Sequence, residues 1–452
     1  MQKFSKLVKV SGRGFATQPK IQTSNVHSDV SEEGIKICSI NKPSISNGIS
    51  RVALVVRGGP VYEEANALGL SHLIRRSFGL SSDQYTAVNL NRHIEFMGGN
   101  AKVTGTKEHL IYTIDCAPNL VPRAAELISN MASDNAYYPW ELKTLANKLM
   151  AYDVEFLNRI DADGLCSELL HEAAFGVHAD GTKLGRSLYS SMDKVGTFTE
   201  EQVMHFHKNM FNSSNISIGI ANMSDSLDSL DLLRDFKNNL KISSGNDIRR
   251  DIHNQQNVYV KLVYYVPSGR NSTSQMLALA IASRALGSKR VLYGIHKDTV
   301  LGKTAGAENF DDSLVEAEAL YQPYSKHSLF GFSLKGSCAK ATNARLNAIV
   351  KSLKAISASG LSEADFAKAK NQLLLDYCDG SVNPYQAIVE NTIDNLEGGS
   401  VNKMEDMKKV IQTMTLEEIN TNLKKILNPG YRAMAVTGCH TSRITPLNVL
   451  PK

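Results

Sequence analysis

Residues 51–76 read RVALVVRGGPVYEEANALGLSHLIRR and decide the fold of this 452-residue chain. The apolar, β-branched run 51–56 predicts a strand, and the glycines and proline at 58–60 predict a turn. A helical segment follows from Ala65 and ends at Gly79. We therefore expect a strand, a tight turn and a helix in immediate succession.

The same succession recurs in the second half of the chain. Residues 258–266, VYVKLVYYV, are again β-branched and aromatic, and Pro267-Ser268-Gly269 supplies the turn. A helix is then predicted from Ser274 to Leu286. Two matching successions in one chain indicate an internal repeat, and such a repeat determines the architecture of the whole protein.

Later segments of the two halves also correspond in order and type. Thr199 and Thr415 are predicted N-caps, because acidic residues follow each of them in the first helical turn, where the helix dipole favours negative charge. Alternating strands precede amphipathic helices in both halves. The corresponding pairs are the strands 109–115 and 329–334, the helices 120–131 and 341–356, the helices that begin near Tyr138 and Leu361, and the final strands 216–220 and 433–436.

Each half is therefore predicted to be an α+β unit, a mixed sheet packed by helices. The first domain is expected at residues 35–222 and the second at 258–440, followed by a tail at 441–452. Residues 223–257 are polar and are interpreted as the linker between them. Two homologous halves of this kind are expected to face each other as a clamshell.

The first residues differ in character from the rest of the chain. Only basic charges precede Asp29, serine and threonine are frequent, and the apolar core of a secretory signal is missing. This composition is typical of a mitochondrial transit peptide, and Arg13-Gly14-Phe15-Ala16 resembles the matrix cleavage pattern. We predict a transit peptide at 1–15 and a flexible segment at 16–34; a disordered basic tail is the alternative.

Composition excludes several classes of protein. The net charge of +5 is small and the basic residues are dispersed, which argues against a nucleic-acid partner. No apolar run reaches the length of about 18 residues that a membrane-spanning helix needs. The cysteines are too far apart for a zinc ribbon or a secreted disulfide framework, so most are expected to be buried small hydrophobes. They are Cys38, Cys116, Cys166, Cys338, Cys378 and Cys439.

Residues 72–76, HLIRR, carry the one suggestive chemical pattern in the chain. The segment resembles the H-x-x-E-H motif of the insulinase-like or pitrilysin-like metallopeptidases, family M16. In that motif two histidines one helical turn apart bind zinc, and the glutamate acts as general base on the metal-bound water. The resemblance extends over nearly the whole chain, through Gly98-Gly99-Asn100-Ala101, the helix end at 171–175 and Leu184-Gly185-Arg186-Ser187.

The departure from the motif determines the function that the resemblance implies. Only His72 is retained, whereas Arg75 takes the position of the base and Arg76 that of the second ligand. A guanidinium neither gives up its proton nor offers a metal a lone pair. The family's third ligand would lie near residues 148–155, where Asp153 and Glu155 are present without a clear register. We therefore predict no catalytic, cofactor-binding or metal-binding residues, and no peptidase activity.

The remaining candidate residues have structural interpretations. His72 is expected to be a satisfied structural histidine, with Arg75 and Arg76 available to solvent or to a neighbour's acids. His205 and His207 are two residues apart and therefore point to different sides of a helix, so they are not expected to bind a metal together. Trp140 is expected to seat its helix in the core. His171, Glu172 and His178 are interpreted as surface or packing residues, and His205 and His207 as histidines that do not form a metal pair.

Within the family, the chain is most similar to the mitochondrial branch, which comprises the processing peptidase subunits and the core subunits of ubiquinol–cytochrome c reductase. The substrate-recognising, non-catalytic processing subunit has a dense glycine-rich loop. In the equivalent region here the glycines are dispersed, which favours a metal-free core subunit. They are Gly287, Gly294, Gly302 and Gly306.

The resemblance thus implies a structural subunit of respiratory complex III, needed for its assembly and stability. It would pair with core subunit 1, contact the cytochrome b and cytochrome c1 subunits, and lie peripherally on the matrix side of the inner membrane. No haem-attachment or iron–sulfur spacing is present, so no cofactor is expected. The alternative is the substrate-recognising subunit of the mitochondrial processing peptidase.

Overall fold

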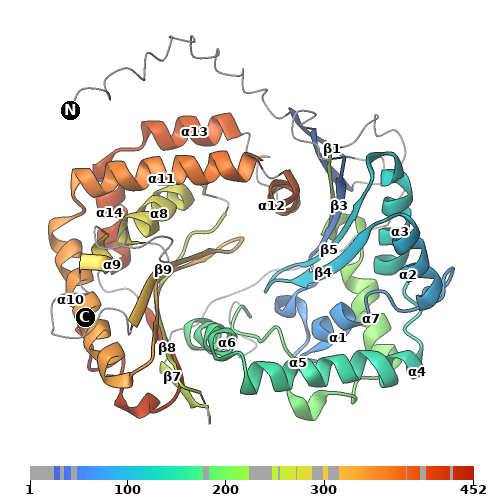
Figure 1. Ribbon diagram of the computed structural model, residues 1–452, viewed down its shortest axis with the longest axis horizontal. Helices are drawn as coiled ribbons and strands as arrows, with labels where there is room; N and C mark the ends of the chain where they lie inside the picture. Colours follow the sequence, from blue (N-terminus) through green and yellow to red (C-terminus); the bar gives the residue numbers. More distant parts are fainter. Residues whose placement is uncertain are drawn as a thin grey trace, which may run out of the picture.

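The chain folds into two halves of the same architecture. A computed structural model describes residues 25–30, 35–41, 48–176, 183–222, 247–252, 255–270, 272–287, 299–303, 315–382, 384–397, 404–427 and 431–451. In Figure 1 the first half lies on the right and the second on the left, with their two sheets facing each other. Most helices cover the outer faces of the sheets, whereas α6 and α12 lie between them. The expected α+β fold with two homologous halves is confirmed.

The first sheet has the strand order β1-β2-β6-β3-β5-β4. The pair β2 and β6 is parallel, and the other neighbouring pairs are antiparallel. Strand β3 is central and buried on both faces, in agreement with its continuous apolar run. The strands are β1 (Asn25–Val30), β2 (Lys36–Asn41), β3 (Ser50–Val56), β4 (Asn100–Gly105), β5 (Leu110–Cys116) and β6 (Ile216–Ala221).

The second sheet, in the order β7-β11-β8-β10-β9, follows the same path through space. Its parallel pair, β7 and β11, matches β2 and β6, and its central strand β8 matches β3. The repeat inferred from the sequence is therefore present in every strand of the first sheet except β1, which has no counterpart in the second. The strands are β7 (Asp247–Asp251), β8 (Val258–Val266), β9 (Val315–Pro323), β10 (Ser328–Gly336) and β11 (Arg432–Gly438).

The helices begin where local chemistry predicts. Thr199 and Gln202 form a reciprocal capping box at the start of α7, and Thr415 caps α14 through the backbone N–H of Glu418. None of the described helices is long and apolar enough to cross a membrane. The helices are α1 (Leu70–Arg76), α2 (Ala87–Phe96), α3 (Val121–Ser133), α4 (Pro139–Glu141), α5 (Asn147–Arg159), α6 (Ala162–Phe175), α7 (Glu200–Met210), α8 (Thr273–Leu286), α9 (Val300–Lys303), α10 (Ala339–Ser359), α11 (Glu363–Val382), α12 (Pro384–Leu396), α13 (Met404–Thr413) and α14 (Leu416–Leu427).

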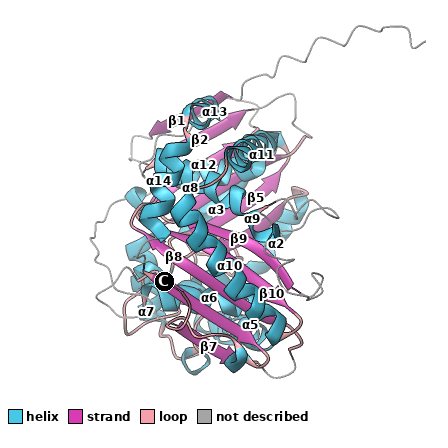
Figure 2. Ribbon diagram, turned by 90° about the vertical axis from the view of Figure 1, so that its left-hand side faces the viewer, coloured by secondary structure: helices cyan, strands magenta, loops and turns pink. Residues whose placement is uncertain are grey.

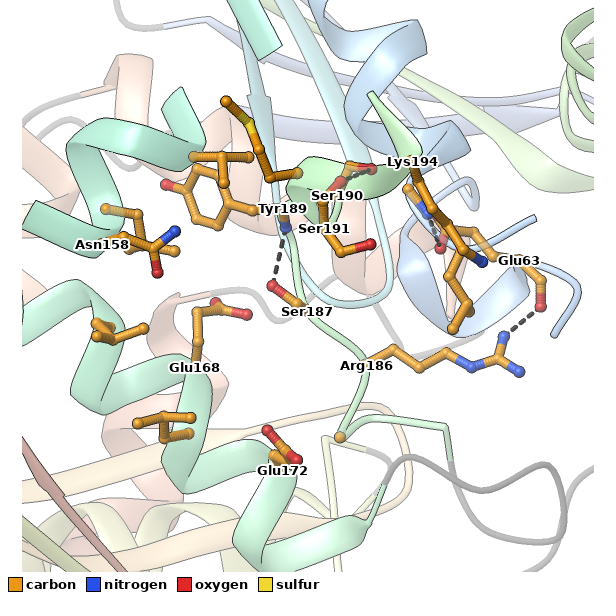
Figure 3. A pocket seen from close by; sticks show the side chains of 18 of the residues that line it. Glu63, Asn158, Glu168, Glu172, Arg186, Ser187, Tyr189, Ser190, Ser191 and Lys194 are labelled. Atoms are coloured by element: carbon orange, nitrogen blue, oxygen red, sulfur yellow. Dashed lines mark hydrogen bonds between the residues drawn. The ribbon is translucent and has the colours of Figure 1, made fainter. Parts of the chain in front are cut away.

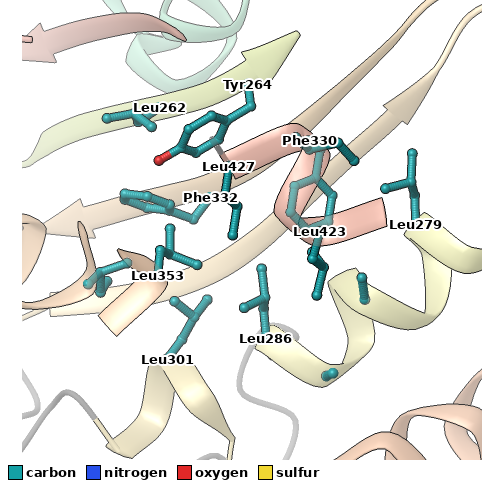
Figure 4. Packing of buried hydrophobic residues seen from close by; sticks show 14 of the residues in the cluster. Leu262, Tyr264, Leu279, Leu286, Leu301, Phe330, Phe332, Leu353, Leu423 and Leu427 are labelled. Carbon is teal, nitrogen blue, oxygen red and sulfur yellow. The ribbon is translucent and has the colours of Figure 1, made fainter. Parts of the chain in front are cut away.

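The outer face of each sheet forms a large apolar core with its own helices. In the second half Leu262 of β8 and Phe332 of β10 meet Leu353 of α10 and Leu423 of α14, as Figure 4 shows. Figure 2, seen from the side of the second half, shows α10 in front of these strands. Burial of this apolar area is the main contribution to the stability of each half.

The inner face of the first sheet is covered by α12, a helix from the second half of the chain. Ile388 packs against Cys38 and Ala221, while Ile393 packs against Val55. Helix and sheet approach so closely that a Cβ atom at Gly219 of β6 would overlap Thr392 Oγ1. Only glycine therefore fits at this position of the strand.

The carboxyl end of α12 is held by basic groups of the first half. Lys36 Nζ donates to Asn395 O at 2.8 Å, and Arg57 Nη2 donates to Leu396 O at 2.7 Å. Cations at a helix C-terminus compensate its unpaired carbonyls and its dipole. The Glu397 carboxylate follows directly and pairs with His109 Nε2 at 2.8 Å.

The inner face of the second sheet is covered in return by α6, a helix from the first half. Cys166 and Phe175 of α6 belong to the same apolar cluster as Val263 of β8 and Ala435 of β11. Lys261, buried in the middle of β8, reaches α6 and pairs with Asp163 at 2.7 Å. The two halves thus exchange one helix each, so that each sheet is completed by the other half.

The structure shows ordered elements within three of the predicted segments. Strand β1 lies within the segment 16–34 that was predicted to be flexible, and β7 lies within the predicted linker 223–257. Both are edge strands, whose polar sequences do not show an apolar alternation. The predicted tail is packed, because Ile444 and Leu450 are buried. The predicted transit peptide at 1–15 lies outside the described residues.

Candidate functional site

Helix α1 carries the zinc-motif positions, and a buried acid fixes where it begins. The Glu63 carboxylate accepts hydrogen bonds from the backbone N–H groups of Gly69 (2.9 Å) and Ser71 (2.8 Å). Gly69 adopts φ +104°, and a Cβ there would lie 2.5 Å from Ser190 Oγ. Burial raises the pKa of Glu63, an effect that the hydrogen bonds at the helix start oppose.

His72 is completely buried, and both of its ring nitrogens are engaged. The backbone N–H of Ser190 donates to Nδ1 at 3.2 Å, so Nδ1 must be unprotonated. The proton of the neutral ring is therefore on Nε2, which lies 2.9 Å from Asp153 Oδ2 and donates to it. Burial lowers the pKa of His72, in agreement with a neutral ring. The prediction of a satisfied structural histidine is confirmed.

Arg76 forms a two-pronged ion pair with the same carboxylate. Its Nε lies 2.5 Å from Asp153 Oδ2 and its Nη2 lies 2.5 Å from Asp153 Oδ1. Burial acts to raise the pKa of Asp153, but hydrogen bonds from His72 and Arg76 outweigh it and hold this pKa at about 2. The Arg76 guanidinium thus supplies the positive charge beside His72 and Asp153.

Arg75 is held by the loop that precedes Ser190. Its guanidinium carbon lies 5.4 Å from the centre of the Tyr189 ring, and Nη2 donates to Leu188 O at 3.2 Å. Both arginines therefore have partners within the chain, although the Arg76 side chain remains 38% exposed, so the expected availability to solvent holds in part. Arg76 already has an acid within the chain, and Arg75 packs against the loop that closes the site.

These residues do not fit a zinc ion. The Nδ1 lone pair of His72 is directed at a backbone N–H, and its Nε2 carries a proton. Asp153 is paired with Arg76, whose positive charge opposes a divalent ion. Among the described residues no group of three or more His, Cys, Asp or Glu side chains is arranged to hold a metal ion. The site is a structural contact between α1, α5 and the loop around Ser190.

Asp153 was not placed by sequence reasoning, although a signal for it exists. It lies on α5 between Met150, Val154 and Leu157, all of them buried. A carboxylate at a core-facing helical position requires a buried partner. That requirement could have selected Asp153 over the exposed Glu155, but the identity of the partner depends on how α1 and α5 pack.

A cavity of about 500 Å³ opens next to the site, between α5, α6 and the loop that contains Ser190 (Figure 3). Glu168 of α6 lines it and pairs with the buried Lys107, whose Nζ lies 2.6 Å from Glu168 Oε2. Arg186, also buried, donates from Nη1 to the backbone oxygens of Pro60 and Glu63. Glu168 and Arg186 therefore have partners inside the chain, and with Lys107 they connect α6 to the segment before α1.

Two of the other candidate histidines, His171 and His207, contribute to packing. His171 is buried and contacts Ser167 O and the Tyr324 hydroxyl of the second half. His207 donates from Nε2 to Ala132 O at 2.6 Å, while His205 is exposed, so the two do point to different sides of α7. His178 lies outside the described residues.

Trp140 contradicts the prediction that it seats its helix in the core. Its side chain is 62% exposed and stacks on the Tyr138 ring, with 4.5 Å between ring centres.

The cysteines agree with the prediction in part. Cys38, Cys116 and Cys166 are buried, whereas Cys338 is exposed at the start of α10. Three of the five described cysteines are therefore buried, and no disulfide is formed among these five.

Sequence comparison relates the chain to two family models. The model of the insulinase family, peptidase family M16, matches residues 36–189. The model of the M16 inactive domain matches residues 197–373. The first match lies within the first half, whereas the second begins with α7 and β6 of the first half and extends into α11 of the second half. Together they cover most of the chain.

Individual proteins and structures agree with this assignment. Cytochrome b-c1 complex subunit 2 of Mus musculus is 25% identical over 403 residues, which are 86% of this chain and 85% of the relative. The mitochondrial-processing peptidase subunit alpha of Solanum tuberosum is 29% identical over 142 residues, 31% of this chain and 27% of the relative. A solved chain of complex III2 from Candida albicans superposes with a TM-score of 0.77 at 15% identity, covering 92% of this chain and 96% of that chain.

Proposed function

The chain belongs to peptidase family M16, and we propose that it serves in that family as a non-catalytic core subunit of the mitochondrial cytochrome b-c1 complex, corresponding to subunit 2. The observation that carries this proposal is the Arg76–Asp153 ion pair. It fills the place of the metal with a side chain, so the zinc-peptidase chemistry of the motif is lost while the fold is kept. The protein then acts through its surfaces, as a structural subunit.

The extent of the similarity favours this role over the processing peptidase. The match to the mouse subunit 2 spans 86% of the chain, whereas the match to the potato processing subunit spans 31%. The region of the four dispersed glycines, 287–306, lies largely outside the described residues. The structural role therefore rests on the length of the match and on the closed metal site.

We propose core subunit 1, cytochrome b and cytochrome c1 as the partners of the chain within the complex. The expected position is peripheral, on the matrix side of the mitochondrial inner membrane. Two observations support it: the basic N-terminal segment has the composition of a matrix-directed transit peptide, and no described helix could span a bilayer.

Fractionation of mitochondria provides the test. After mild detergent extraction of the inner membrane, the chain should co-purify with haem-bearing subunits through size exclusion. It should contain far less than one zinc per chain by elemental analysis. A soluble heterodimer without haem that binds basic amphipathic peptides would instead identify a processing subunit. One stoichiometric zinc per chain would instead identify an active zinc peptidase.

A further inference from the structure

An apolar stripe runs along the outer face of the helix formed by α4 and α5. Seven large hydrophobic side chains in the segment 138–160 are between 36% and 65% exposed. The segment comprises α4, a π-helical turn at Leu142–Ala146 and α5, with Tyr138 and Ile160 at its two ends. From Leu145 to Ile160 the exposed residues recur at intervals of three and four, which places them on one side of the helix. The helix lies along the lower edge of the molecule in Figure 1. We call this set the α5 stripe: Tyr138, Trp140, Leu145, Leu149, Tyr152, Phe156 and Ile160.

The stripe is additional to the face that α5 turns to the core. That face is formed by Met150, Asp153, Val154 and Leu157, all buried. A surface helix normally needs one apolar face. The second face exposes on the order of 700 Å² if a fully exposed side chain of this kind has about 200 Å². A standard protein interface buries about 800 Å² on each partner, so the area suits a specific contact.

The sequence of the stripe is self-complementary in the antiparallel direction. About a two-fold axis between Leu149 and Tyr152, each of these residues lies opposite the other on a second helix, and Leu145 lies opposite Phe156. A two-fold contact requires this reciprocity. The rings are also pre-arranged, because Tyr152 and Phe156 are nearly parallel at 6.2 Å.

Opposite charges lie beside the stripe. Lys148 and Glu155 are both exposed and seven residues apart, so they lie on the same flank of α5 but two turns away from each other. Among the described residues, Glu155 pairs with Arg159 at 3.5 Å. In the antiparallel pair Lys148 of one copy is offset from Glu155 of the other by two residues, about 3 Å along the helix, which is within reach of the two side chains, and the contact occurs twice by symmetry.

We propose that the α5 stripe is a homotypic interface that pairs with the same stripe of a second copy of this chain. This proposal does not depend on the assignment to a respiratory complex. It explains why α5 has two apolar faces and why opposite charges are spaced along one flank. The stacked Tyr138 and Trp140 would then cover Ile160 at each end of the pair.

Sedimentation of the purified full-length chain over a range of concentrations tests the pairing. The wild type should form a reversible dimer, and the double variant Leu149→Lys/Tyr152→Lys should weaken it by at least tenfold, because four lysines would face each other. Phe96→Lys changes a residue on α2 that is 92% exposed and is the matched control, which should leave dimerisation unchanged. A wild type that stays monomeric up to 100-fold above the usual working concentration would overturn the proposal.

A charge exchange distinguishes a second copy from any other partner. Lys148→Glu and Glu155→Lys should each weaken the dimer by roughly two- to tenfold, the usual range for exposed ion pairs at an interface. The exchange Lys148→Glu/Glu155→Lys should restore wild-type dimerisation, because only a second copy carries the compensating change. If the stripe variants impair binding to another subunit and the exchange restores nothing, the partner is a different protein and the proposal is wrong.

Discussion

At the scale of single residues, Asp153 joins the parts of the former metal site. It accepts a hydrogen bond from the buried His72 and pairs through both oxygens with Arg76. The sequence predicted that His72 does not bind zinc, because arginines in the positions of the base and of the second ligand exclude the metal by their chemistry alone. It did not predict that Arg76 pairs with Asp153. Which side of α5 faces α1 depends on how the two helices pack against each other.

Replacement of this acid should be costly. Asp153→Asn removes the charge that compensates Arg76 and retains the shape, so the free energy of unfolding should fall by about 1–3 kcal/mol, less than for a fully buried pair because Arg76 is 38% exposed. Chemical denaturation followed by circular dichroism would measure this loss. Glu155→Gln, on the exposed side of the same helix, should change the value by less than about 0.5 kcal/mol; equal effects of the two substitutions would contradict this account.

A second prediction at this scale concerns acid stability. Burial lowers the pKa of His207 from 6.5 to about 4, an effect that its hydrogen bond to Ala132 O only partly opposes. The unfolded chain therefore binds the proton first as the pH falls. The stabilisation is complete above pH 6.5 and is lost progressively down to pH 4, by up to about 3 kcal/mol.

Unfolding midpoints in denaturant between pH 7 and pH 4 would test this. The His207→Gln variant retains a donor for Ala132 O but cannot titrate, so its pH dependence should be shallower than that of the wild type. The exposed His205→Gln serves as control and should follow the wild type. A His207→Gln profile as steep as the wild-type profile would show that other groups dominate.

At the scale of elements, most strands and helix starts were predicted, because apolar period and capping chemistry are local properties. Strands β1, β2, β7 and β9 were missed. The edge strands β1 and β7 are polar and do not show that period. The exchange of α6 and α12 was not predictable either. Strand β3 shows by its continuous apolar run that both faces of its sheet are covered, but the run carries no information about which helix covers the inner face.

The contact between β6 and α12 gives a prediction for this scale. Gly219→Ala places a methyl group against Thr392 Oγ1 and Ile388, so it should destabilise the chain by about 1–3 kcal/mol. Removal of the obstructing hydroxyl in Gly219→Ala/Thr392→Ala should recover part of the loss. Thermal unfolding of both variants and of Thr392→Ala alone would show whether the two changes are non-additive; simple additivity would argue against the close contact.

At the scale of the whole molecule, each half lacks one helix that the other provides. Residues 35–222 expressed alone would expose the apolar surface of Cys38, Val55 and Ala221 that α12 covers. We expect either half alone to aggregate or to unfold without cooperativity, and the two halves expressed together to form a stable 1:1 complex. Size exclusion and circular dichroism of separate and co-expressed halves would check this, and a monomeric first half with a sharp unfolding transition would refute it.

The guanidinium of Arg76 is a cation that the chain always carries with it. A fold completed by a dissociable ion is stabilised by mass action, in proportion to the logarithm of the free ion concentration. Here the counter-charge of Asp153 belongs to the same chain, so its local concentration is set by the packing of α1 against α5 and never by the surroundings. The amount of folded protein is therefore uncoupled from zinc supply: neither added zinc nor a chelator should shift the melting temperature, and the subunit can accumulate in a metal-starved cell as readily as in a replete one.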